Sequence, residues 1–154
     1  MTITYVKSDY AMAAAGVTTP VVVDLGLGID EAARILGISL EVGGATKFEA
    51  DQVSTLEAAY SFDPEDVLIE PTDDEQFAYL CVVISAITAS TGAMKQTENY
   101  FLDFSRMNLI TTRNLAFLVA SAAAGITAKG TGRVYYEKYK PPVAELTQLI
   151  ATRR

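Results

Sequence analysis

Residues 130–154 read GTGRVYYEKYKPPVAELTQLIATRR, and this stretch decides how the chain is organised. Its first part is rich in valine and tyrosine, which fit a pleated, half-buried surface, so we predict a strand there. Pro141 and Pro142 end the strand, because a proline has no N–H to donate to a neighbouring strand. A chain that finishes in a strand and a short tail is expected to dock that tail on its own body or on a neighbouring copy.

The residues after the two prolines, 143–154, predict a short amphipathic helix. Its apolar stripe consists of residues at helical spacing, namely Val143, Leu146, Thr147 and Ile150. Glu145 in the first turn, and Arg153 and Arg154 at the end, suit the dipole of a helix.

Composition limits the classes of function. The 154 residues suffice for one domain with a hydrophobic core, and we expect a single domain over 1–154. The net charge of −7 argues against direct binding of nucleic acid, which requires lysine and arginine along a surface. The chain has no histidine and a single cysteine, Cys81, so histidine-dependent catalysis, histidine-bound metals and an internal disulfide are excluded. We expect no signal peptide and no transmembrane segment.

The rest of the chain predicts short strands separated by turns. From Leu36 to Val42 even positions are apolar and odd positions are small or polar, which is the pattern of a strand with one wet face, and Gly43-Gly44 is expected to end it. Residues 77–88 and 115–120 are apolar on both faces and are expected to be covered on both sides. Residues 89–98 are expected to be a polar connection. About eight strands and one helix predict an all-β fold, an antiparallel sandwich and more narrowly a jelly roll.

A glycine-rich segment offers an alternative. Residues 22–28, VVDLGLG, resemble the first motif of S-adenosylmethionine-dependent methyltransferases, with residues 30–36 as the following helix and Glu41 as the acid that binds ribose. The third glycine of such fingerprints is absent, the helix would be short, and no strand–helix alternation follows. Two strands joined by a polar loop explain the segment better.

Three other features could form a binding or reactive site. The acidic segment 63–75 lacks the regular spacing of a calcium loop, so a solvated loop is favoured over a cation site. Cys81 is expected to be a buried, inert thiol. We assign no catalytic, cofactor-binding or metal-binding residue and expect no enzyme. Basic residues gather at the C-terminal end, which suits head-to-tail contact between copies: Lys129, Arg133, Lys138, Lys140, Arg153 and Arg154.

Residues 109–115, LITTRNL, and residues 132–139, GRVYYEKY, with the short tail resemble small single-jelly-roll coat proteins of viruses. The resemblance implies a structural subunit that tiles a shell in a virion, assembled in the host cytoplasm, with itself and other virion proteins as partners. Coat proteins that hold a genome often have a basic arm, whereas residues 1–16 offer only Lys7. The resemblance therefore implies that an internal membrane or another protein lines the shell.

We accordingly expect a self-assembling, homo-oligomeric subunit. The residues expected at its assembly interface are Tyr135, Tyr139, Val143, Leu146, Ile150, Arg153 and Arg154. Two alternatives remain open. One is a ligand- or glycan-binding sandwich, such as a receptor-binding or cement protein, which would use tyrosines and loop carboxylates. The other is a small methyltransferase-like enzyme.

Overall fold

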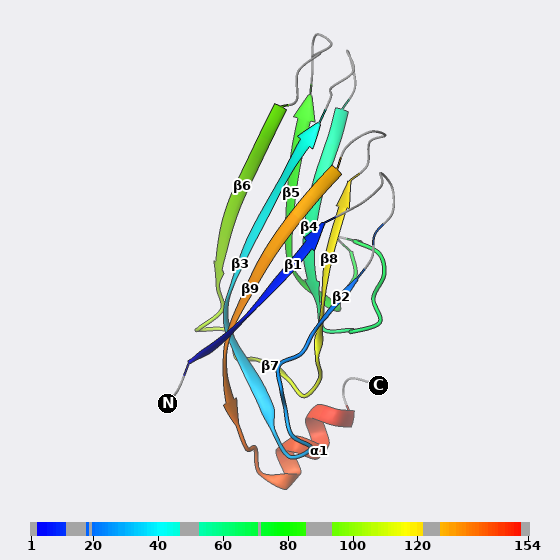
Figure 1. Cartoon of the computed structure of the whole chain (residues 1–154). Coiled ribbons are helices and arrows are strands. Elements are labelled where there is room, and N and C mark those ends of the chain that lie inside the picture. Colours follow the sequence, from blue (N-terminus) through cyan, green and yellow to red (C-terminus); the bar gives the residue numbers. More distant parts are fainter. Residues whose placement is uncertain are drawn as a thin grey trace.

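The chain folds as two antiparallel β-sheets stacked face to face, with a short helix beyond one end (Figure 1). The computed structural model describes residues 3–11, 18, 20–46, 53–70, 72–85, 94–121 and 127–151. The elements in these ranges are β1 (Thr4–Ala11), β2 (Val21–Val23), β3 (Ala32–Thr46), β4 (Val53–Ser61), β5 (Gln76–Ser85), β6 (Met94–Asp103), β7 (Leu109–Thr111), β8 (Leu115–Ser121), β9 (Thr127–Tyr139) and α1 (Val143–Ala151). The predicted all-β antiparallel sandwich with a short C-terminal helix is confirmed.

The order of the strands is that of a jelly roll. Sheet A runs β1-β9-β3-β6, with β7 also beside β3, and sheet B runs β2-β8-β4-β5. The antiparallel pairs β1–β9, β2–β8, β3–β6 and β4–β5 are successive parts of one long hairpin, whose tip lies between β4 and β5. Rolling up this hairpin places β9 beside β3 and β8 beside β4, which closes the two sheets.

The closing strand β9 lies inside sheet A, between β1 and β3. It pairs with β1 from Thr4↔Tyr136 to Ala11↔Lys129, and with β3 from Ala32↔Tyr139 to Ala45↔Thr127. A strand with a partner on each side satisfies its backbone groups along its length. The valine- and tyrosine-rich segment is therefore the spine of the sheet, and it ends before the two prolines as predicted.

A bulge at Leu36 changes which side chains of β3 face the core. The pairing with β9 skips this residue between Ile35 and Gly37, and the Leu36 carbonyl accepts a hydrogen bond from the Phe104 N–H at 2.9 Å. Before the bulge Ile35 is buried, and after it Ile38 and the following even positions are buried. One extra residue reverses the alternation of a strand. This explains why the period-two pattern begins only at Leu36.

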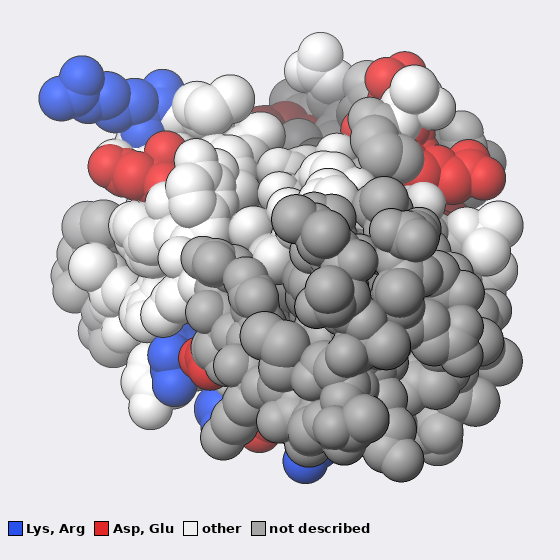
Figure 2. All heavy atoms as spheres, turned by 90° about the horizontal axis from the view of Figure 1, so that it is seen from above, with Lys and Arg blue, Asp and Glu red and all other residues white. Residues whose placement is uncertain are grey.

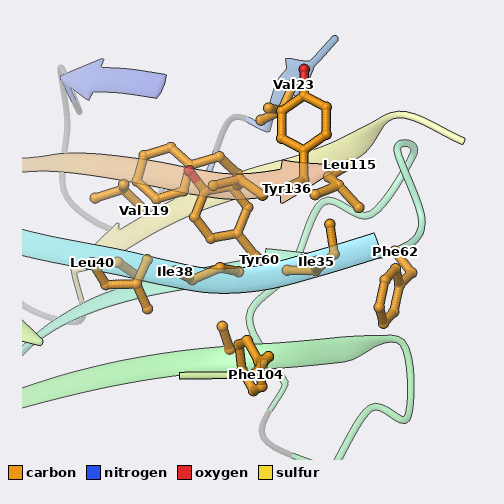
Figure 3. Packing of buried hydrophobic residues seen from close by; sticks show 14 of the residues in the cluster. Val23, Ile35, Ile38, Leu40, Tyr60, Phe62, Phe104, Leu115, Val119 and Tyr136 are labelled. Atoms are coloured by element: carbon orange, nitrogen blue, oxygen red, sulfur yellow. The ribbon is translucent and has the colours of Figure 1, made fainter. Parts of the chain in front are cut away.

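The core lies between the two sheets and is filled by side chains from both. Figure 3 shows Ile35, Ile38 and Leu40 of β3 facing the side chains of sheet B. Tyr60 of β4 has no exposed surface and reaches across the sandwich to β9, where a Cβ on Gly132 would lie 2.7 Å from its ring carbons. The glycine in β9 therefore makes room for a ring from the opposite sheet.

Three boundaries differ from the prediction. β5 is an edge strand of sheet B with Val83 exposed, so residues 77–85 are not covered on both sides. β6 begins at Met94, within the expected polar connection, because these polar residues pair with the far end of β3. β3 continues through Gly43 and Gly44 to Thr46, since both glycines pair with β6 and β9. Among helices in the described ranges, none has the length and apolar character needed to cross a bilayer.

Candidate functional site

The residues predicted for an assembly interface fall in two places. Tyr135 lies on the outer face of sheet A, half-buried between neighbouring rings. Tyr139, at the end of β9, lies beside α1, which carries Val143, Leu146 and Ile150. Arg153 and Arg154 lie outside the described residues. The structure therefore brings Tyr139 together with the helix and separates Tyr135 from both.

A side-chain hydrogen bond holds the start of α1 against the end of β9. The Tyr139 hydroxyl donates this bond to Glu145 Oε1 at 3.0 Å. The Leu146 N–H donates to the Pro142 carbonyl at 3.0 Å, which closes the first turn of the helix itself. Burial raises the pKa of the Tyr139 hydroxyl, and the Glu145 carboxylate raises that pKa further. The phenol is therefore protonated at neutral pH and remains a donor to Glu145.

An ion pair on the outer face of sheet A supports this junction. Arg34 of β3 lies 2.9 Å from Glu137 of β9, measured from Nη1 to Oε1, and its guanidinium lies 5.4 Å from the centre of the Tyr139 ring. The Glu137 side chain is only 13% exposed, so this pair is better shielded from water than an ordinary surface pair. The cation over the ring fixes Tyr139 where it can reach the helix.

The apolar stripe of α1 is left uncovered at the end of the sandwich. No residue of α1 is buried, and within the stripe Val143 is 81% exposed, Ile150 is 44% exposed and Leu146 is half-buried. Figure 1 shows the helix beyond the ends of the strands, where no described strand covers it. The helix is thus held by contacts at its first turn while its apolar residues remain available to a partner.

Sequence reasoning did not identify two further aromatic residues beside Tyr135. The Tyr5 and Tyr135 rings have centroids 6.0 Å apart, and the same distance separates the Phe101 and Tyr135 rings. The alternation of Tyr100, Leu102 and Phe104 does imply that Phe101 faces the other way. Which residues it meets depends on the pairing of β6 with β3, and no local pattern specifies that pairing.

The glycine-rich segment 24–31 is a loop between sheets, not a nucleotide site. Residues 32–46 form strand β3 in place of the methyltransferase helix, and both sheets are antiparallel. Gly26 has a φ of 62°, and its carbonyl accepts a hydrogen bond from Lys138 Nζ at 2.6 Å. Lys140 pairs with Asp30 at 2.8 Å. The methyltransferase-like alternative is therefore wrong, because the glycine-rich turn leads into a strand of an antiparallel sheet and not into a helix.

The acidic loop between β4 and β5 uses carboxylates to shape its own backbone. Asp63 Oδ1 and Asp73 Oδ1 each accept a backbone N–H two residues on, at 2.9 Å. Gln76 closes the loop by donating from Nε2 to Asp66 Oδ2 at 2.9 Å and to the Leu68 carbonyl at 2.7 Å. No group of three or more cysteine or acidic residues in the described ranges is placed to hold a metal ion. Figure 2 shows one group of acidic side chains at the right without basic neighbours, and further acidic side chains beside basic ones at the left and bottom.

Cys81 differs from its expected position. Its side chain is half-buried on the edge strand β5 rather than enclosed in the core. Its Sγ–H donates a hydrogen bond to Glu57 Oε1, with 3.7 Å between the two heavy atoms.

Comparison with known proteins gives similar structures but no relative by sequence. No protein-family model matches the chain, and no curated protein sequence matches it. A crystal structure of the infectious bursal disease virus VP2 subviral particle aligns with 84% of this chain and 33% of that chain, at 10% identity and a TM-score of 0.40. A structure of the T13 particle of the same virus aligns with 93% of this chain and 42% of that chain, at 11% identity and a TM-score of 0.24. The chain spans less than half the length of these proteins, and TM-scores below 0.5 leave its function to be argued from its own structure.

Proposed function

We propose that this chain is a non-enzymatic structural subunit that assembles with copies of itself into the coat of a virion. The observation that carries the proposal is the uncovered apolar stripe of α1 at the end of a jelly-roll body. Jelly rolls recur in viral shells, where the sheets form a rigid tile and the ends and edges meet neighbours. The site in this chain offers contact surface rather than a set of reacting groups.

The free energy of assembly would come from covering exposed apolar side chains and strand edges. Burying a valine or isoleucine side chain completely contributes about 1.5–3 kcal/mol. Val143 and Ile150 lie at i and i+7 on one face of α1, with Leu146 between them. Further unpaired backbone groups lie on the edge strands, which are β1 and β6 in sheet A and β2 and β5 in sheet B.

The negative charge of the subunit indicates what could lie against it inside the proposed coat. With a net charge of −7, the chain is poorly suited to neutralise phosphate groups along nucleic acid. In the proposed coat, another virion protein or an internal membrane would therefore separate the subunits from the genome. The subunits would assemble in the host cytoplasm and reside in the virion.

The test compares the particle size of three forms of the chain by light scattering. We expect megadalton particles from the unaltered chain, and folded subunits that form no particles from the double variant V143S/I150S, which removes the exposed stripe. The matched control A144S/A151S changes the same helix at exposed positions outside the stripe and should assemble normally.

Two outcomes would overturn the proposal. An unaltered chain that stays a trimer or smaller at every concentration would favour the alternative of a ligand-binding module. Unchanged particles in V143S/I150S would remove α1 from the mechanism. Circular dichroism of the variants shows whether each one keeps its sheet structure, so a loss of assembly can be separated from a loss of folding.

A further inference from the structure

A row of aromatic side chains crosses the outer face of sheet A. The pairing register places Tyr5 of β1 opposite Tyr135 of β9, and Tyr135 opposite Gly37 of β3. Phe101 of β6 leans over that glycine, because a Cβ on Gly37 would lie 2.8 Å from Phe101 Cζ. The three rings, Tyr5, Tyr135 and Phe101, therefore cross β1, β9, β3 and β6, four of the sheet's five strands, and are called the aromatic row below.

The aromatic row remains open to solvent. Tyr5 is 62% exposed, Phe101 is 58% exposed and Tyr135 is half-buried between them. Ile3, also exposed, lies at the start of the same face. Figure 1 shows α1 beyond the end of the strands and not across this face. An exposed group of large apolar side chains rimmed by charges is typical of a surface that binds another protein.

The rings of the row are tilted against one another. The Tyr5 and Tyr135 planes differ by 37°, and the Phe101 and Tyr135 planes differ by 69°. Tilted rings leave notches between them that apolar side chains of a partner can fill.

A two-fold axis brings the rings of the row against themselves. An axis that runs across the strands through Tyr135 places Tyr5 and Tyr135 each opposite their own counterparts in the second copy. Glu137 is already held by Arg34 at 2.9 Å, so the contact is made by the apolar rings and not by new ion pairs. A surface patch that meets its own copy is the requirement for a two-fold interface between identical chains.

The size of the face suits a stable dimer. Sheet A is four strands wide along its main path, and β9 is 13 residues long. At about 4.8 Å between strands and about 3.3 Å per residue, the face measures roughly 19 by 43 Å, or about 800 Å². That is the area each partner contributes to an interface of standard size, about 800 Å².

We propose that the outer face of sheet A binds the same face of a second copy, with the aromatic rows in contact and a two-fold axis at Tyr135. This inference rests on the proposed function, because it supplies a second contact for self-assembly, independent of α1. The sheet face makes a dimer, and the α1 stripe joins dimers into larger particles.

Cross-linking at the axis tests the geometry. In a C81A background, which removes the native thiol, Y135C places two thiols at the axis, and mild oxidation should link most of the chain into dimers. The control S39C puts a thiol on the same face of β3, one row away from the axis. It should form few dimers under the same oxidation. Equal and slow cross-linking of both variants would overturn the proposal.

A second test does not depend on engineered thiols. Y5S/F101S removes the two most exposed rings of the row, and sedimentation should show a dimer dissociation constant raised roughly tenfold or more. The control V22S/V83S removes two exposed valines from sheet B and should leave the dimer unchanged. Unfolding in urea shows that both variants remain folded. An unchanged dissociation constant in Y5S/F101S would overturn the sheet-face dimer.

The two proposals fail in different ways. If both hold, V143S/I150S stops at dimers, whereas Y5S/F101S is monomeric at low concentration. Monomers in V143S/I150S would assign all association to α1 and overturn the sheet-face dimer alone. Particles that form normally in V143S/I150S but not in Y5S/F101S would keep the dimer and overturn the role of the helix.

Discussion

The two faces of sheet A place an aromatic ring over a glycine in the same way, with opposite consequences. On the inner face, the Tyr60 ring from sheet B packs onto Gly132 of β9 and has no exposed surface. On the outer face, the Phe101 ring from β6 packs over Gly37 of β3 and keeps 58% of its surface exposed.

The inner ring stabilises the fold, whereas the outer ring is placed to contact another molecule. The inner ring is enclosed by two sheets, so its apolar surface already contributes to folding. The outer ring rests on one sheet only, so much of its surface is still in water and can contribute to association. Substitutions at the two glycines and the two rings should therefore affect different properties of the molecule.

The largest difference is expected from truncating the rings. Y60A removes an enclosed ring and leaves an apolar cavity in the core, so it should lower the free energy of unfolding by about 3–5 kcal/mol. F101A removes a ring that is mostly in solvent and should lower it by about 1 kcal/mol or less. Urea unfolding monitored by circular dichroism measures both. Similar losses for the two variants would show that the outer ring belongs to the core.

The glycines give the next largest contrast. In G132A the new Cβ would meet the Tyr60 ring carbons at 2.7 Å, and overpacking of this kind costs about 1–3 kcal/mol. In G37A the Cβ meets the far edge of Phe101, which can swing into solvent, and the Leu102 carbonyl oxygen at 3.2 Å, which needs only a small backbone shift. We therefore expect a loss of about 1 kcal/mol or less. Neither glycine has a positive φ, so steric contact alone is compared. A G37A variant as unstable as G132A would contradict this distinction.

Alkaline pH should weaken the inner face. Burial raises the pKa of Tyr60 above its ordinary value of 10.0, and burial likewise raises the pKa of Tyr136. A raised pKa means that the folded state holds the proton more tightly, so stability is complete below pH 10 and falls as the pH rises above it. Tyr60 alone should cost about 1.4 kcal/mol per pH unit above 10. Y60F should remove that share of the slope in urea titrations at pH 9, 10 and 11, and an unchanged slope would contradict the assignment.

The smallest effect is expected from the Tyr60 hydroxyl at neutral pH. This buried oxygen forms no hydrogen bond, and a buried polar atom without a partner destabilises the fold. Y60F keeps the ring and removes that atom, so the free energy of unfolding should rise by about 1 kcal/mol or less. Thermal unfolding at pH 7 measures the change. A loss of more than 1 kcal/mol would show that the hydroxyl has a partner, with Ser8 the nearest candidate by its influence on the pKa of Tyr60.

Local patterns predicted the parts of the fold that depend on neighbours in sequence. The two prolines end β9, the valine- and tyrosine-rich segment is a strand, and residues 115–119 are buried on both faces in β8. The alternation after Leu36 was likewise predicted, whereas no local pattern indicated the bulge at Leu36 itself. The polar start of β6 was missed because its partner, the far end of β3, lies about fifty residues away in sequence.

The candidate site was predictable only in part, for the same reason. Helical spacing predicts the apolar stripe of α1, and the structure adds that no residue of this helix is buried. The aromatic row could not be predicted, since Tyr5, Phe101 and Tyr135 come from three separate strands. Their proximity is a result of the rolled hairpin, which no local pattern records.

Sedimentation velocity of the unaltered chain over a wide range of concentration tests the central claim most directly. If the exposed apolar surfaces are covered by identical copies, the sedimenting mass should rise from one or two chains at low concentration to large particles at high concentration. A single species with the mass of one chain at every concentration would contradict the account.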